Sequence, residues 1–171
     1  GYREAYVAFI AQMFELAGIE GGAEKAEAIM ALETRIAEVH WTQARSRNIS
    51  EIYNPMPLDQ LDALAPQFDF TSGMDQLGLT SVPTYLVAQP SAIEETAAIF
   101  ADTSVDIWKD YMTFHFIQSN AGSMPAAFDA ANFAFYGTTL NGTGEQRPRD
   151  RRGVNLVGGQ LGEAVGQVYV E

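Results

Sequence analysis

The chain has 171 residues and 47% of them are hydrophobic, which is enough to bury the core of a single domain spanning residues 1–171. Its formal net charge of −12 gives the surface a sign that repels a phosphate backbone, so nucleic acid is excluded as an expected partner. The absence of cysteine excludes disulfide bonds and cysteine-ligated zinc, and no apolar run approaches the ~18 residues that a transmembrane helix requires.

The N-terminal part predicts two helices joined by a short turn. Apolar side chains recur every three or four positions over residues 2–16, which is the spacing of one helix face. Gly18, Gly21 and Gly22 then favour a turn, because glycine readily adopts the left-handed conformation that ends helices. A second helix, packed antiparallel to the first, is expected over about residues 24–47 with a buried stripe formed by Ile29, Leu32, Ile36, Val39 and Trp41.

The middle of the chain predicts short elements and a single strand. The prolines within residues 53–57 favour an extended segment, because a proline disfavours the helical conformation of the residue before it. Short helices are expected over residues 58–64 and 71–77. Residues 82–88 (VPTYLVA) are predicted to form a strand, which must pair with a second strand because a single strand cannot satisfy its own hydrogen bonds.

Beyond residue 90 the pattern is helical again. Ser91 and Glu94 have the spacing of a capping box, which predicts a helix start at Ser91. A longer helix is expected over about residues 105–122, and a further one, capped by Ser123, is expected to stop at Gly137. The whole pattern predicts a mostly α fold, a multi-helix domain of packed amphipathic helices with one short β element near residues 82–88.

A final helix, starting near Arg151, is expected to carry Val154, Val157, Leu161, Val165 and Val168 on one side. Gly158, Gly162 and Gly166 are four residues apart and share one face of this helix. A glycine inside a helix costs about 0.5 to 1 kcal/mol against alanine, so three in register indicate the close approach of another backbone. We expect that neighbour within this domain, and the alternative is interdomain packing.

The sequence carries no catalytic or metal-binding motif that we can identify. A zinc-binding H-E-x-x-H helix needs glutamate directly after its first histidine, whereas Trp41 follows His40, and His115 is expected on another helix. We interpret both histidines as structural and predict no metal ligand. The acidic pairs Glu94–Glu95 and Asp59/Asp62 are interpreted as solvated, so no catalytic residue is predicted.

Basic residues are concentrated in one short segment that contains Arg147, Arg149, Arg151 and Arg152. The chain before this segment is therefore more acidic than the average suggests. Such a run predicts a solvated loop or helix start, and the alternative is docking against an acidic surface elsewhere in a longer polypeptide.

Segments spread over most of the chain carry a family resemblance. Residues 32–37 (LETRIA) resemble an L-E-x-x-I-A helix, and residues 44–45 and 53–56 resemble A-R-R-x and Y-N-x-M. Residues 135–142 (FYGTTLNG) resemble F-Y-x-x-x-L-x-G, and residues 161–170 (LGEAVGQVYV) resemble L-G-E-A-L-G-x-L-Y-V. In this order and spacing, the segments resemble the N-terminal domain of the neprilysin and endothelin-converting-enzyme family of zinc metallopeptidases.

The chain departs from the family pattern at two points. Ser46 interrupts the paired arginines, and Asn48 stands near the usual place of an acidic residue. Arg151–Arg152 occupies the place of an expected arginine–tryptophan pair. No family salt bridge or aromatic contact is carried over to these positions.

The resemblance implies a mostly helical N-terminal lid that covers a thermolysin-like catalytic domain and admits peptides to an enclosed cavity. Zinc and the general-base glutamate would lie beyond Glu171, so no cofactor is expected in this part. The implied partners are the catalytic domain of the same polypeptide and, through it, peptide substrates. The resemblance favours an extracytoplasmic location, and the missing cysteines resemble bacterial relatives more than animal ones.

Two other functions stay open. A self-sufficient helical module would bind a peptide or protein as a monomer, and a hydrolase in its own right would hold stoichiometric metal or cleave peptides. The lid interpretation predicts neither zinc nor activity in this chain alone. It predicts exposed apolar faces and hence a tendency to form a dimer.

Overall fold

The computed structural model describes all residues, 1–171, and contains ten α-helices and one two-stranded sheet, so the predicted mostly α fold is confirmed. None of its helices has both the length and the apolar composition needed to span a membrane. The α-helices are α1 (Tyr2–Leu16), α2 (Gly22–Val39), α3 (Ile49–Ile52), α4 (Leu58–Leu64), α5 (Phe70–Gln76), α6 (Pro90–Asp102), α7 (Val105–Asn120), α8 (Ala126–Asn132), α9 (Arg149–Gln160) and α10 (Gly162–Val170). The remaining elements are the 3₁₀ turns η1 (Arg45–Arg47) and η2 (Ala121–Ser123), the π-helix η3 (Phe133–Leu140), and the strands β1 (Pro55–Met56) and β2 (Tyr85–Leu86).

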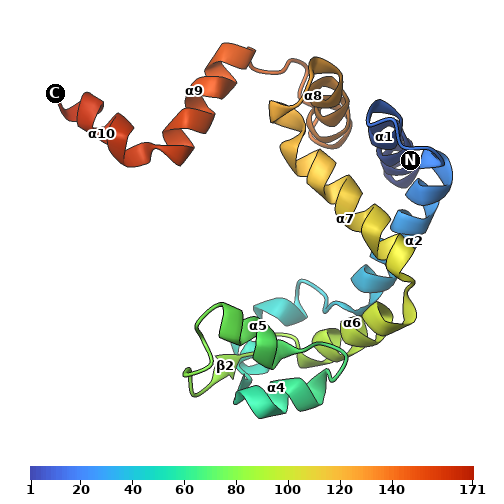
Figure 1. The fold of residues 1–171 in the computed structure, drawn as a ribbon, viewed down its shortest axis with the longest axis vertical. Coiled ribbons are helices and arrows are strands. Elements are labelled where there is room, and N and C mark those ends of the chain that lie inside the picture. Colours follow the sequence, from blue (N-terminus) through green and yellow to red (C-terminus); the bar gives the residue numbers. More distant parts are fainter.

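The elements form three parts, which Figure 1 shows from end to end. One group contains α1, α2, α7 and α8, and a second contains α4, α5, α6 and β2. The last two helices, α9 and α10, form an arm that projects from the end near α8. The first two parts are joined through α2, which contacts both α6 and α7.

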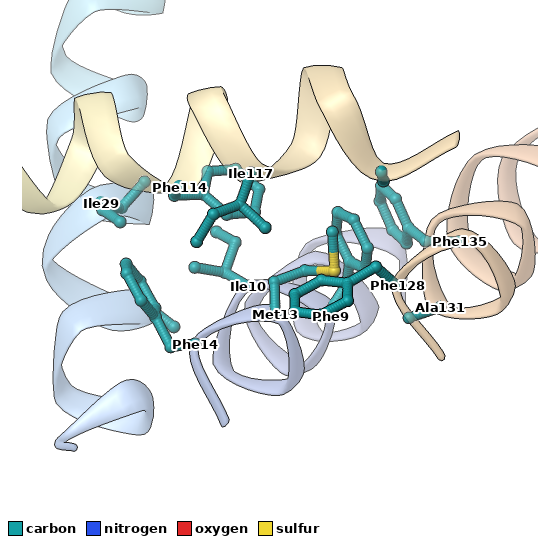
Figure 2. Packing of buried hydrophobic residues seen from close by; sticks show 12 residues of the cluster. Phe9, Ile10, Met13, Phe14, Ile29, Phe114, Ile117, Phe128, Ala131 and Phe135 are labelled. Atoms are coloured by element: carbon teal, nitrogen blue, oxygen red, sulfur yellow. The ribbon is translucent and has the colours of Figure 1, made fainter. Parts of the chain in front are cut away.

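The main core lies among α1, α2, α7, α8 and η3. Helical spacing in α1 places Phe9, Ile10, Met13 and Phe14 on one buried face. The Phe9 ring stacks on Phe135 at 5.0 Å between centroids, and it meets Phe114 edge to face at 5.8 Å. Figure 2 shows these side chains converging between the helices. Aromatic rings from α1, α7 and η3 therefore hold the first group together.

Glycine geometry sets the turn between α1 and α2, as the sequence predicts. Gly18 and Gly21 have φ values of 70° and 72°, which L side chains adopt at a cost. A Cβ on Gly22 would lie 3.0 Å from the carbonyl oxygen of Ala11 and 3.2 Å from Cβ of Phe14. The absence of a side chain at Gly22 lets the start of α2 approach α1 closely.

Helix α2 ends at Val39, so the prediction that it extends to Arg47 is wrong. After His40, tertiary hydrogen bonds replace helical ones. The Trp41 backbone N–H donates to the Gln89 side chain, and the Trp41 indole donates to Ser91 Oγ at 2.8 Å. Ser91 consequently does not cap α6, which begins with Pro90 at its first position. The predicted capping box is therefore wrong as well.

The predicted strand over residues 82–88 is reduced to the two residues of β2, which pair antiparallel with β1 in the register Pro55↔Leu86 and Met56↔Tyr85. The preceding segment forms a turn in which the Val82 N–H donates to the Leu79 carbonyl. Pro83 has no N–H to donate to a sheet ladder. The predicted helices in this region are present as α4 and, shifted by one residue, α5.

Helix α8 begins after Pro125, so the predicted cap at Ser123 is wrong. The chain also passes through Gly137 without stopping and continues as the π-helix η3 to Leu140. The Phe133 ring occupies the space where a Cβ of residue 137 would lie, so a side chain there would require the ring to shift. Asn141 closes the π-helix by donating from Nδ2 to the Tyr136 carbonyl.

Candidate functional site

The arm formed by α9 and α10 is the most exposed apolar surface of the chain. Every large aliphatic or aromatic residue in it is at least 45% exposed: Val154, Leu156, Val157, Leu161, Val165, Val168, Tyr169 and Val170. The arm has no buried residue. The apolar side chains that the sequence places on one helix face are therefore exposed within this chain.

The predicted single final helix is wrong, because the chain breaks at Leu161 (φ −121°, ψ 38°). Gly158 lies in α9, whereas Gly162 and Gly166 lie in α10. Apart from the adjacent residues and the backbone of its own helix, no atom of the chain lies within 4 Å of the position that a Cβ would occupy on any of the three. The close neighbour that we expected inside this domain does not occur in this chain.

Neither helix of the arm is expected to be stable without tertiary contacts. They have 12 and 9 residues, and isolated helices shorter than about 12–15 residues are marginal in water. Five glycines, each costing about 1 kcal/mol against alanine inside a helix, lower the intrinsic helix propensity further. Helices of this kind depend on tertiary packing, which this chain does not supply.

The base of the arm is held by one buried carboxylate. Asp129 in α8 is only 6% exposed and receives both Nη atoms of Arg152, at 2.8 and 2.6 Å. Gln146 donates to the same carboxylate at 2.9 Å, and Arg149 lies 3.6 Å from it. The hydrogen bond from Arg152 is the main reason that the pKa of Asp129 lies below its ordinary value.

Two arginines of the basic segment therefore form ion pairs within this chain. Arg149 and Arg152 face Asp129, whereas Arg147 and Arg151 are exposed. Beyond these contacts, an open pocket of about 500 Å³ lies between the start of α9 and the end of α7, with Ser119, Ser123 and Leu156 in its lining. The arm is thus attached at its base and free along its length.

The two histidines lie in different environments and do not fit a zinc site. His115 Nε2 lies 2.8 Å from Oε1 of Glu33, and Tyr6 donates its hydroxyl to the same oxygen at 3.0 Å. These bonds join α1, α2 and α7. His40 is exposed at the end of α2, and no three His, Cys, Asp or Glu side chains gather as a metal-ligand set.

The sequence did not predict that Tyr6, Glu33 and His115 form a hydrogen-bonded cluster, although each of them lies on a predicted helix. Burial and the nearby Glu33 carboxylate raise the pKa of the Tyr6 hydroxyl above its ordinary value of 10.0. Lys25 in α2 adds a further bond to α7, with 2.7 Å between Nζ and Oδ1 of Asp110. Polar contacts therefore fix the relative position of the three helices.

Of the two acidic pairs, only Asp62 has a structural role. Asp62 accepts hydrogen bonds from the backbone N–H and the hydroxyl of Thr71 and thereby joins α4 to α5. Asp59 is exposed, as are Glu94 and Glu95. None of these carboxylates has an arrangement typical of acid–base catalysis.

Residues near the A-R-R-x resemblance form a second contact that the sequence did not reveal. The Arg45 guanidinium lies 3.5 Å from the centre of the Trp41 ring and donates to Glu51 at 2.7 Å. Asn54 of the Y-N-x-M resemblance donates to the Val87 carbonyl and thereby supports the β1–β2 pair. The Arg45–Glu51 bond joins η1 to α3, and the Asn54–Val87 bond joins the residue before β1 to the residue after β2.

The whole chain, residues 1–171, matches the N-terminal-domain model of peptidase family M13. The chain belongs to peptidase family M13. The resemblance to the neprilysin family is thus confirmed, and it covers the arm as well as the rest of this M13 chain.

Two relatives illustrate the match. Neprilysin-2 of Drosophila melanogaster is 26% identical over 97% of this chain and 24% of its own length. The neutral endopeptidase of Lactobacillus helveticus is 26% identical over 92% of this chain and 24% of its own length. The M13 chain therefore spans about a quarter of the length of these relatives.

Solved structures of Mycobacterium tuberculosis zinc metalloprotease Zmp1 are also similar. The open state is 34% identical with a TM-score of 0.88, and the match covers 99% of this chain and 27% of that one. The complex with an inhibitor is 34% identical with a TM-score of 0.89, and the match covers 99% of this chain and 26% of that one. Because the matches cover 99% of the M13 chain, they include α9 and α10.

Proposed function

We propose that this chain is the non-catalytic lid of a longer zinc metalloendopeptidase and that it restricts the catalytic cleft to peptides. The observation that carries the proposal is that all 171 residues match the N-terminal domain of family M13 while spanning about a quarter of the relatives. The zinc ion and the groups that activate water are assigned to the remainder of the polypeptide. Within this chain, His115 and Glu33 form a bond between helices instead.

A lid of this kind acts by shape and by binding at a distance from the reacting bond. Closure over a cleft excludes a folded domain sterically, whereas a flexible peptide can enter. Contacts between the lid and remote parts of the peptide would supply binding energy that positions the scissile bond. The lid therefore affects which substrates react more than the chemical step itself.

The experiment compares one cleavage sequence in two contexts, using the full-length polypeptide that contains this chain. The sequence is supplied as a free peptide and as a surface loop of a small folded domain. We expect cleavage of the peptide and a kcat/KM lower by a factor on the order of 100 or more for the folded domain. Equal kcat/KM values for the two substrates would show that size restriction is wrong.

We further propose that Gly158, Gly162 and Gly166 contribute to interdomain packing. The absence of any neighbour within 4 Å of their Cβ positions supports a partner outside this chain. The same exposed surface supports dimer formation by the chain in isolation, because apolar faces that lack their partner tend to associate.

The main alternative is a self-sufficient helical binding module. Isothermal titration of the isolated chain with peptides, together with metal analysis, distinguishes the two: a module binds peptide with measurable affinity, whereas a lid separated from its catalytic domain binds neither peptide nor stoichiometric zinc. The extracytoplasmic location, the bacterial source and the treatment of residues 1–171 as one domain stay predictions. The relatives named above come from an insect and from bacteria.

A further inference from the structure

We propose that an amphipathic helix from the remainder of the same polypeptide packs against the apolar face of the arm. This inference rests on the proposed function, because it requires the longer family polypeptide. It names the surface through which the lid is attached and the kind of partner that covers it.

The face is defined by its spacing. In α10 and at the preceding break, Leu161, Val165 and Val168 are separated by four and three residues and share one side of the helix. They are 58%, 45% and 77% exposed. Gln167 is two positions from Val165 and therefore lies on the nearly opposite side. An apolar stripe opposite a polar one is the pattern of a helix that packs against a partner helix.

The arm that carries this face is anchored to the rest of the chain at its start. The fork between Arg152 and Asp129, with distances of 2.8 and 2.6 Å, ties the start of α9 to a buried position in α8. Gln146 and Arg149 approach the same carboxylate. A surface that is anchored at one end can reach fewer positions before its partner arrives, so it loses less conformational freedom on binding than an unanchored one.

The remainder of the polypeptide is a better candidate to cover this face than a substrate or a second copy of the chain. The arm helices are short and rich in glycine, so they need a partner that is always present, and a transient peptide cannot provide that. The arm is included in the matches to Zmp1 chains of which this chain covers only 26–27%. A covalently linked segment also acts at a high effective concentration, which a second copy lacks.

The test uses the full-length polypeptide with Val165→Glu and, as a matched control, Gln167→Glu. Both place one negative charge on α10, on its apolar and polar sides respectively. Hydrogen–deuterium exchange is followed for residues 154–170. We expect the amides in the unmodified polypeptide and in Gln167→Glu to exchange slower by a factor on the order of 100 or more than in Val165→Glu. In the 171-residue chain alone, at a dilution where sedimentation shows a monomer, the two variants should exchange equally.

Several results would overturn the inference. Rapid exchange of the arm in the unmodified polypeptide would show that nothing covers it, and equal exchange in the two variants would show that this face is not the one covered. Protection that appears only with added peptide would assign the face to substrate. Protection that disappears when sedimentation shows a dimer dissociating would assign it to a second copy. The test is independent of the lid function, because size restriction can fail while the arm stays protected.

Discussion

At the scale of the residue, the position of the arm depends on Asp129. Its carboxylate accepts hydrogen bonds from Arg152 and Gln146 while only 6% of the residue is exposed. The sequence indicated that the arginines were clustered, but not that one aspartate 23 positions earlier would receive them. No local pattern in the sequence reveals such a pair, because it is created by η3 and the loop that connect α8 to α9.

Replacing Asp129 with asparagine should destabilise the chain by about 2 kcal/mol, because a charged hydrogen-bond acceptor is removed from a buried site. The pKa of Asp129 is lowered in the folded state, so its contribution is present above the ordinary pKa of 3.8 and is lost as the pH falls below that value. Urea unfolding between pH 7 and pH 3 measures this. The exposed Asp75→Asn serves as the control and should leave the free energy of unfolding nearly unchanged.

Tyr6→Phe removes one of the two hydrogen bonds to Oε1 of Glu33 and should cost about 1 kcal/mol. Because the folded-state pKa of Tyr6 is raised, its contribution is complete below pH 10 and decreases as the pH rises above it. Denaturation at pH 8 and above pH 10 should therefore show a smaller loss with pH in Tyr6→Phe than in the unmodified chain. An identical loss in both would contradict the assignment to Tyr6.

At the scale of the element, helix existence follows from periodicity, whereas helix ends follow from tertiary contacts. The apolar spacing of α1 and α7 predicts both helices correctly. The end of α2 at Val39 and the start of α6 at Pro90 depend on bonds from Trp41 to Gln89 and Ser91. These partners lie about 50 positions away, so no local pattern contains them.

The π-helix gives a direct test at this scale. Gly137→Ala places a methyl group in the space of the Phe133 ring and should destabilise the chain by about 2 kcal/mol. Gly122→Ala is the matched control, because nothing lies within 4 Å of its Cβ position. Thermal unfolding measures both variants. A similar Tm for the two would show that the ring moves aside without cost.

The arm glycines can be tested in two contexts. In the isolated chain, Gly166→Ala and the control Gly159→Ala should each leave stability unchanged or raise it by up to about 1 kcal/mol, since neither Cβ meets an atom. In the full-length polypeptide, only Gly166→Ala should lower the Tm, because the proposed interdomain packing places another backbone against its face. Interdomain packing at Gly166 is contradicted if both variants raise the Tm there.

At the scale of the whole molecule, the arm differs from the rest of the chain in burial. The rest of the chain has an aromatic core joining α1, α7 and η3, whereas none of the 22 residues from Arg149 to Val170 is buried. Sedimentation of the isolated chain should therefore show a dimer, and Val165→Glu should shift it toward the monomer. Persistence of the dimer in this variant would place the contact on another surface.

The sequence by itself determined the mostly α class, the positions of α1, α4 and α7 and the family resemblance, because periodic spacing and ordered motifs are local properties of the chain. It also predicted apolar side chains along the arm, but not the break at Leu161. Only the tertiary structure decided that Asp129 holds the arm, that Glu33 joins Tyr6 to His115, and that the three glycines have no neighbour here. Those facts depend on which distant residues the fold brings within hydrogen-bonding or van der Waals distance, and no local pattern records that distance.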